Sequence, residues 1–294
     1  MLRRSLVLVA AAGVLALAVA AGPMAAIDTA RSSTAAAVVP HRIVSLSPTA
    51  TESLFAIGAG SQVIAVDDQS DYPKTAPRTK LSGFTPNVEA IASYKPDLVI
   101  ISFNPKGLTD ALGKLRIRVV QQPPAATLGD AYAQIRQLGQ LTGHGGAAGA
   151  LVTKMKARIA AIVTARKGVG NGRTVYHELD QTLFSATSKT FIGRIYQLFG
   201  LRNIADAADT AGSGYPQLSA EYVIEQNPEL IVLADTVCCG QTAATVAARP
   251  GWDHIRAVRT GSIIRLNDSI ASRWGPRIVQ LVQAVGRALA RPAQ

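Results

Sequence analysis

His177, Glu178 and Asp180 form the cluster in this sequence that most resembles a metal site or a catalytic centre. They lie on and just after a predicted strand over 174–177, and successive side chains of a strand point to opposite faces. His177 is therefore expected to face away from the two carboxylates, and the other histidines are far apart in the chain. The sequence also lacks Gly-x-Ser-x-Gly, His-Glu-x-x-His and a phosphate-binding P-loop. We therefore expect no catalytic residue, no metal centre and no cofactor.

A second group of side chains offers flat apolar faces, and its members lie in predicted loops or at predicted strand ends. They are Tyr72, Phe84, Phe103, Tyr215 and Trp274. Aromatic faces hold a flat macrocycle or an aromatic chelator by dispersion and stacking, at a small cost in conformational entropy. Ordinary loop packing is the alternative. Arg273 and Arg277 could reach anionic groups of such a ligand, because an arginine fork suits carboxylate or phosphate.

The elements that must position these residues follow an α/β pattern. Short apolar runs predict strands, and helical spacing between them predicts connecting helices. The predicted strands are 43–46, 63–66, 98–101 and 119–120, then 174–177, 203–205, 230–233 and 263–266. The intervening segment 127–167 has helical spacing weakened around Gly143, and predicts either one long helix or two in succession.

An internal repeat links the two halves of this pattern. Asn87-Val88-Glu89-Ala90-Ile91 precedes Pro96-Asp97-Leu98-Val99-Ile100, and Ser219-Ala220-Glu221-Tyr222-Val223 precedes Pro228-Glu229-Leu230-Ile231-Val232. Both copies keep a helix cap, an acid, aliphatic residues, a proline and a buried strand. We therefore predict two similar α/β lobes with mainly parallel sheets, 41–126 and 168–292, joined by a bridging helix at 127–167. In such sheets ligands bind beyond the carboxyl ends of the strands, so the cleft between the lobes is the expected site.

Composition and the N-terminus indicate an exported binding protein. The net charge is +11, but the basic residues are scattered singly, which favours a solvated basic surface and gives no reason to expect nucleic acid. Residues 1–26 carry a basic start and an apolar stretch, and predict a signal peptide or an uncleaved anchor; 27–40 predict a flexible linker. The adjacent Cys238 and Cys239 could form a disulfide or stay as thiols.

Several segments resemble, in the same order, the periplasmic binding proteins of iron-siderophore and vitamin B12 ABC importers, and the resemblance is nearest to the vitamin B12-binding members. It covers about residues 41–291. The segments are RIVSLSPTATESLFAI, SDYP, NVEAIASYKPDLVI, YPQLSAEYVIEQNPELIVL and WGPRIVQLV. The resemblance implies a class III binding protein with two α/β lobes bridged by a long helix. It also implies a monomer that delivers its ligand to a dimeric permease.

The resemblance also implies roles for individual residues. Tyr72, Tyr215 and, with a one-residue gap, Phe84 match aromatic positions of the cleft, and Asp268 with Arg273 approximates a polar pair on the opposite wall. The expected ligand is a metal chelate, a corrinoid as first choice and a ferric siderophore or haem as second.

Glu89 and Glu221 match the glutamates that pair with permease arginines, although an acid in a first helical turn is also favourable by itself. The rival from another class is a non-transport envelope interaction or signalling protein.

Overall fold

A computed structural model describes residues 39–290, apart from the side chain of Lys106. The predicted signal peptide and nearly all of the predicted linker lie outside these residues. Within the described part of the chain, no helix combines the length and the apolar character needed to cross a membrane.

The first lobe contains a sheet of four parallel strands in the order β2-β1-β3-β4. The strands are β1 Ile43–Leu46, β2 Val63–Val66, β3 Leu98–Ile101 and β4 Arg118–Gln121. The helices between them are α1 Pro48–Ala56, α2 Val88–Ser93 and α3 Leu108–Lys114. Every residue of β1 and β3 is buried, because helices cover both faces of the sheet, as their continuous apolar runs predict.

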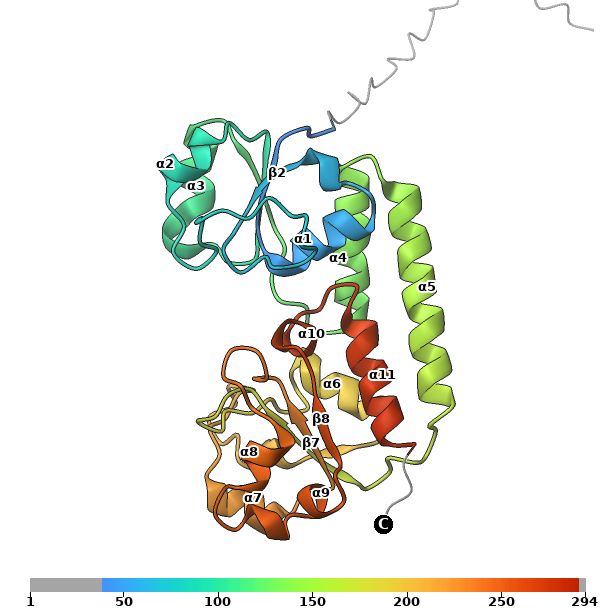
Figure 1. The fold of residues 1–294 in the computed structure, drawn as a ribbon. Helices are drawn as coiled ribbons and strands as arrows, with labels where there is room; N and C mark the ends of the chain where they lie inside the picture. Colours follow the sequence, from blue (N-terminus) through green and yellow to red (C-terminus); the bar gives the residue numbers. More distant parts are fainter. Residues whose placement is uncertain (1–38, 291–294) are drawn as a thin grey trace, which may run out of the picture. The chain divides into compact units, whose positions relative to one another are not determined.

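The second lobe repeats the strand order, with β6-β5-β7-β8 all parallel. Its strands are β5 Thr174–Glu178, β6 Arg202–Asn203, β7 Leu230–Leu233 and β8 Ile263–Arg265. Its helices are α6 Phe191–Gln197, α7 Ala220–Gln226, α8 Ala243–Ala247, α9 Arg256–Arg259, α10 Asp268–Ser272 and α11 Ile278–Ala288. The two sheets share one topology, which confirms the prediction of two similar lobes (Figure 1).

The repeated sequence motif makes the same local structure in each lobe. Asn87 caps α2 by accepting a hydrogen bond from the backbone N–H of Ala90 at 2.7 Å. Ser219 caps α7 in the same way, from the N–H of Tyr222 at 3.1 Å. A side-chain cap satisfies one of the unpaired N–H groups of the first turn, so each motif fixes where its helix begins.

The segment between the lobes forms two helices, α4 Leu128–Leu141 and α5 Gly145–Thr164. Thr127 and Asp130 start α4 with a capping box. The chain turns at Gly143, whose φ of +78° is a left-handed conformation that side chains disfavour. The two helices lie side by side, and α5 also packs against α11 of the second lobe (Figure 1).

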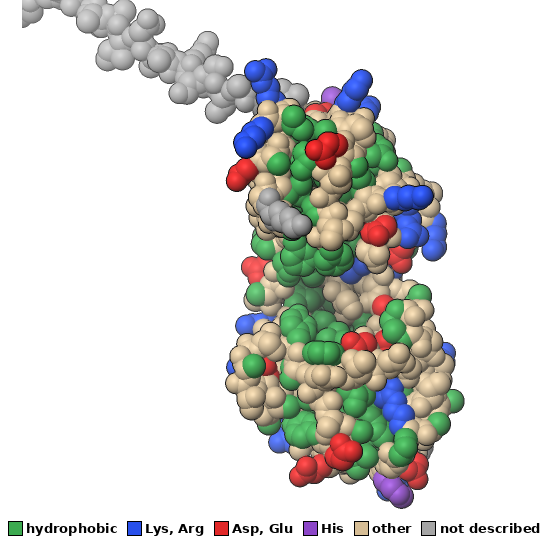
Figure 2. Space-filling model, turned by 90° about the vertical axis from the view of Figure 1, so that its left-hand side faces the viewer, with side chains coloured by type: hydrophobic (Ala, Val, Ile, Leu, Met, Phe, Trp, Pro, Cys, Tyr) green, Lys and Arg blue, Asp and Glu red, His purple; other side chains and the backbone are tan. Residues whose placement is uncertain are grey.

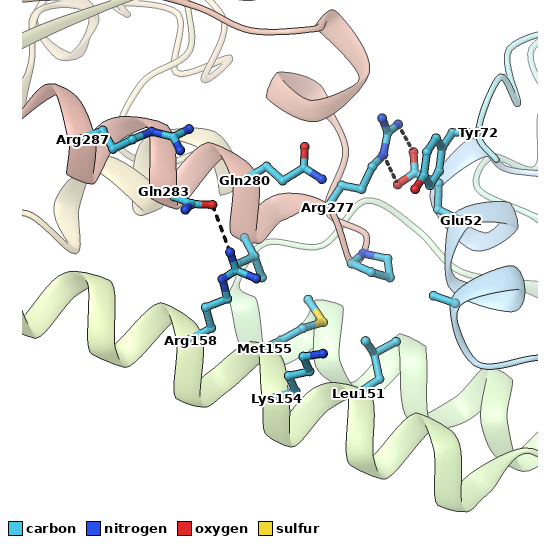
Figure 3. A pocket seen from close by; sticks show the side chains of 13 residues that line it. Glu52, Tyr72, Leu151, Lys154, Met155, Arg158, Arg277, Gln280, Gln283 and Arg287 are labelled. Atoms are coloured by element: carbon cyan, nitrogen blue, oxygen red, sulfur yellow. Dashed lines mark hydrogen bonds and ion pairs between the residues drawn. The ribbon is translucent and has the colours of Figure 1, made fainter. Parts of the chain in front are cut away.

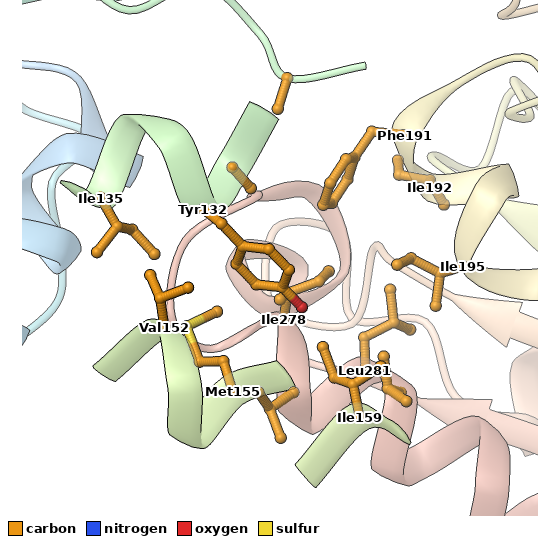
Figure 4. Close-up of a cluster of buried hydrophobic side chains, with 14 of the residues drawn as sticks. Tyr132, Ile135, Val152, Met155, Ile159, Phe191, Ile192, Ile195, Ile278 and Leu281 are labelled. Carbon is orange, nitrogen blue, oxygen red and sulfur yellow. The ribbon is translucent and has the colours of Figure 1, made fainter. Parts of the chain in front are cut away.

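A continuous hydrophobic core joins the lobes through these helices. Tyr132 and Ile135 of α4 and Met155 of α5 belong to the same buried cluster as Ile195 of α6 and Leu281 of α11 (Figure 4). Because close-packed interiors resist deformation, a shared core limits how far one lobe can move against the other.

Two sequence-based elements differ from the structure. The chain from 203 to 205 is mostly a 3-10 turn, with β6 reduced to Arg202–Asn203. The connecting helix expected between the strands 230–233 and 263–266 is divided into α8, a 3-10 turn at Trp252–His254 and α9. These elements are only two to five residues long. Hydrophobic periodicity in a sequence cannot distinguish elements this short from turns.

Candidate functional site

The carboxyl ends of β1, β2 and β3 meet at one edge of the first sheet and open into a pocket of about 270 Å³. Its walls come from Leu46, Pro48, Thr49, Asp67, Gln69, Gly83, Phe84, Ser102, Phe103, Arg273 and Trp274. Arg273 and Trp274 follow β8 and α10 of the second lobe. The carboxyl ends of the strands in the first lobe therefore face a segment that follows the last strand of the second lobe. This is the place where the sequence predicts the cleft.

Two phenylalanines form the apolar wall of this pocket. The rings of Phe84 and Phe103 stack with their centroids 5.7 Å apart and their planes at 27°. Their exposed fractions are 66% and 45%, high for side chains of this kind. Figure 2 shows hydrophobic side chains gathered on both sides of the hollow between the lobes. Exposed aromatic surface in a concave place is typical of a binding site.

Polar groups lie beneath this aromatic wall. The Ser102 hydroxyl donates a 2.7 Å hydrogen bond to that of Ser47, the N-cap residue of α1. Asp67, directly after β2, is buried, and burial raises the pKa of its carboxyl to about 6. Its Oδ1 has no hydrogen-bond partner among residues 39–290. Gly83 lies against Asp67, and a Cβ there would come within 2.8 Å of the Leu46 carbonyl oxygen. Only glycine lets the loop approach so closely.

Trp274 and Arg273 are held in place by contacts across the lobes. The Trp274 indole donates to the Gln134 side chain of α4 at 2.9 Å. Arg273 donates to Glu52 of α1 at 2.9 Å, to Asp71 at 2.7 Å and to the Gln69 carbonyl oxygen at 2.8 Å. A guanidinium engaged in this way is a fixed wall of the pocket, with few donors left for a ligand.

Glu52 is the centre of this interlobe network, which comprises Glu52, Asp71, Arg273 and Arg277. Its carboxylate is fully buried and accepts hydrogen bonds from both arginines. Burial would raise the pKa of Asp71, but the hydrogen bond and charge of Arg273 outweigh it and lower that pKa. Glu52 was not singled out from the sequence, because an acid on a predicted helix gives no sign of a partner more than 200 residues away.

The structure places Tyr72 outside the pocket of the phenylalanines. The Arg277 guanidinium lies over the Tyr72 ring, with its Cζ atom 4.2 Å from the ring centroid. Both residues line a second pocket, formed by α1, α5 and α11 (Figure 3). The side chain is 44% exposed. Of the aromatic residues predicted for the cleft, the structure therefore brings together Phe84, Phe103 and Trp274.

Tyr215 lies in the second lobe, in the segment between β6 and α7, and is 46% exposed. This segment pairs with the chain that follows β5: Ser185 donates to the carbonyl oxygen of Pro216 at 2.9 Å, and Phe184 bridges to Gln217. Phe184 is 38% exposed. The sequence does not predict Phe184 as a site residue, because only the pairing of these two loops brings its segment to the segment of Tyr215.

Asp268 organises the loop that carries the adjacent cysteines. Its carboxylate accepts hydrogen bonds from the backbone N–H groups of Val237 at 2.9 Å and Cys238 at 2.7 Å. Cys238 and Cys239 are joined in a disulfide, one of the two states left open by the sequence. Asp268 thus shapes the rim at the carboxyl end of β7, and its two carboxylate oxygens are both occupied.

The His177 cluster separates as strand alternation predicts. His177 hydrogen-bonds the Tyr196 hydroxyl, and burial lowers its pKa to about 3. Glu178 receives two 2.6 Å hydrogen bonds from Arg249. Burial, and then repulsion from Glu178, raise the pKa of nearby Asp235 to about 7. Among residues 39–290, no group of three or more histidine, cysteine or acidic side chains is placed to hold a metal ion.

Glu89 and Glu221 are exposed in the first turns of α2 and α7, at corresponding places in the two lobes. In Figure 1 these helices lie at opposite ends of the two lobes. The N–H groups at the start of α7 and the Ser219 hydroxyl lower the pKa of Glu221. Both carboxylates therefore face solvent, and the start of α7 favours the charged form of Glu221.

Known proteins resemble this chain along most of its length. The family model described as periplasmic binding protein matches residues 43–270. A cobalamin-binding protein of Halobacterium salinarum is 32% identical over 250 residues, covering 82% of this chain and 67% of the relative. A vitamin B12-binding protein of Pectobacterium carotovorum is 30% identical over 258 residues, covering 86% and 89%.

Solved structures share the fold. A periplasmic heme-binding protein from Roseiflexus sp. RS-1 has a TM-score of 0.74 and 25% identity, covering 86% of this chain and 99% of that one. The periplasmic vitamin B12 binding protein of Vibrio cholerae has a TM-score of 0.69 and 24% identity, with coverage of 85% and 97%. The two-lobed architecture is therefore shared with proteins that bind large ring-shaped chelates.

Proposed function

The chain belongs to the periplasmic binding protein family, and we propose that it is the exported solute-binding protein of an ABC importer that captures a metal chelate, with a corrinoid as first choice. The observation that carries the proposal is the stacked, exposed pair Phe84 and Phe103 in the pocket between the lobes. Aromatic faces contact the edge or plane of a macrocycle, and both curated relatives described above are named for cobalamin.

The chemistry of the pocket supports a chelate over a bare ion. Bare divalent ions require several oxygen, nitrogen or sulfur ligands at one point. The pocket instead combines aromatic faces with one buried carboxyl, that of Asp67, and hydroxyls that already bond one another. Such a site binds a ligand whose metal is already coordinated, and it does so as a binding protein without catalysis.

The second lobe supplies the opposite wall in this proposal. Tyr215 and Phe184 stand on paired loops beyond the carboxyl ends of β5 and β6. A ligand larger than the 270 Å³ pocket of the first lobe would extend toward them. The similarity to a heme-binding protein makes haem, with ferric siderophores, the second candidate ligand.

Delivery to the permease is proposed to use Glu89 and Glu221. One exposed carboxylate per lobe, at equivalent positions, matches a two-fold-symmetric partner that presents one cation to each. Charges at the rim of an interface set register and association rate more than affinity.

Fluorescence quenching against cobalamin, haem and a ferric siderophore tests the ligand proposal, because Trp274 lines the pocket. We expect saturable quenching by cobalamin, weakened in Phe84→Ala. Leu115→Ala is the matched control, since Leu115 is 53% exposed but lies beyond α3, outside the pocket. A response to the siderophore alone would reject the corrinoid. No response to any chelate would favour a non-transport envelope protein.

A further inference from the structure

A second pocket of about 480 Å³ lies between α1, α5 and α11, apart from the aromatic wall of the cleft (Figure 3). We call it the helix groove. Its floor is apolar and includes Leu151 and Met155, and Lys154, Arg158, Arg277 and Arg287 stand around it. The groove is thus an apolar floor surrounded by four cations.

The positive charge of the groove is largely uncompensated. Among the residues that the structure describes, Glu52 is the one carboxylate that lines the groove, and it already bonds Arg273 and Arg277. Within the described part of the chain, Lys154, Arg158 and Arg287 form no ion pair. Three cations therefore face one concave space without an acidic partner among residues 39–290.

The placement of two of these cations is unfavourable while the groove is empty. Lys154 and Arg158 are four residues apart on α5, where like charges repel one another. Gln283 of α11 accepts a 3.2 Å hydrogen bond from Arg158 and so directs its guanidinium across the groove (Figure 3). A bound anion would relieve the repulsion, because opposite charges nearby stabilise both cations.

The size of the groove sets the class of anion. Arg277 and Arg287 lie at opposite ends of α11, a separation of about 15 Å at 1.5 Å per residue. Arg277 is held by Glu52 at one end of this span, which leaves Lys154, Arg158 and Arg287, three cations on two helices, to contact an anion. Guanidinium and ammonium groups together recognise phosphate, which accepts several charge-assisted hydrogen bonds.

We propose that the helix groove binds a multiply charged, phosphate-bearing ligand, either a free oligophosphate or the headgroups of an anionic lipid. Lys154 and Arg158 bind from α5, Arg287 binds from α11, and Arg277 stays in its ion pair with Glu52 as a fixed wall. This site is independent of chelate capture in the cleft.

The test uses the full chain with two probes, pyrophosphate in calorimetry and phosphatidylglycerol vesicles in co-sedimentation, with phosphatidylcholine vesicles as reference. The double variant Lys154→Gln/Arg158→Gln removes two groove cations. The charge-matched control Lys156→Gln/Arg136→Gln removes two exposed cations that do not line the groove. Arg287→Gln, also an exposed side chain, is a second groove variant in case the first changes stability.

We expect saturable 1:1 binding of pyrophosphate, weakened tenfold or more in both groove variants and less than twofold in the control. If the protein bound phosphatidylglycerol vesicles but not pyrophosphate, and the groove variants weakened this binding, the ligand would be a lipid headgroup and not a free oligophosphate. Loss of binding that is equal in groove and control variants would overturn the proposal, as would no binding of either probe. Chelate binding is expected to be unchanged in all variants.

Discussion

Replacing Glu52 by glutamine should show how strongly the interlobe network holds the two lobes together. The side chain of Glu52 is 0% exposed, and those of Arg273 and Arg277 are 14% and 13% exposed. Glutamine keeps the shape and one acceptor oxygen but removes the negative charge between two arginines. The variant therefore leaves two nearly buried cations with too little compensation.

Breaking a buried ion pair by removing one partner costs about 3–5 kcal/mol. Asp71 still pairs with Arg273, and both guanidinium groups keep some contact with water. We therefore expect Glu52→Gln to lower the free energy of unfolding by about 3 kcal/mol, the lower end of that range. For a domain of this size each kcal/mol lowers the melting temperature by about 2–4 °C, which gives a decrease of about 6–12 °C.

Differential scanning calorimetry at pH 7 measures this decrease. Glu89→Gln is the matched control, because the same substitution at an exposed carboxylate should change stability by less than about 0.5 kcal/mol. Asp71→Asn should lower the melting temperature less than Glu52→Gln does, since Arg273 then keeps its ion pair with Glu52. A melting temperature of Glu52→Gln within about 2 °C of the parent would show that the network does not hold the two lobes together.

Three further predictions concern the pocket and the docking carboxylates. Burial raises the pKa of Asp67 from 3.8 to about 6, so its protonated form stabilises the fold at low pH and this stability is lost as pH rises through 6. In denaturant titrations, the free energy of unfolding of Asp67→Asn should therefore rise relative to that of the parent by on the order of 3 kcal/mol between pH 4 and pH 7.5. A difference between the two proteins that does not change with pH would contradict the burial of this charge. Phe84→Ala should weaken chelate binding about tenfold in calorimetry, because its ring is 66% exposed and covering half of that surface is worth about 1.5 kcal/mol; unchanged affinity would remove it from the site. Glu89→Ala with Glu221→Ala should abolish uptake by cells and leave chelate affinity intact, whereas reduced affinity would place these carboxylates in the cleft.

The sequence predicted the architecture well, because that architecture depends on local signals. Continuous apolar runs such as Leu98–Ile101 are buried strands, and the capped motifs at Asn87 and Ser219 begin matching helices. The two lobes share one strand order, in agreement with the repeat of these motifs.

The site was predicted less completely, because it depends on contacts between distant segments. Phe84, Phe103 and Trp274, which the sequence places in loops or at strand ends, line one pocket. The Tyr72 ring instead contacts Arg277, and the sequence around Tyr72 does not predict contact with a cation more than 200 residues away. The same limit hid Glu52 and Phe184, whose partners lie far away or on a paired loop.

Calorimetric titration of the full chain with cobalamin shows directly whether the cleft binds a metal chelate. We expect saturable binding with one cobalamin per chain and a negative heat-capacity change, because aromatic surface becomes buried between the lobes. Absence of any heat with cobalamin, combined with 1:1 binding of a bare divalent metal ion, would contradict a cleft built for a chelate.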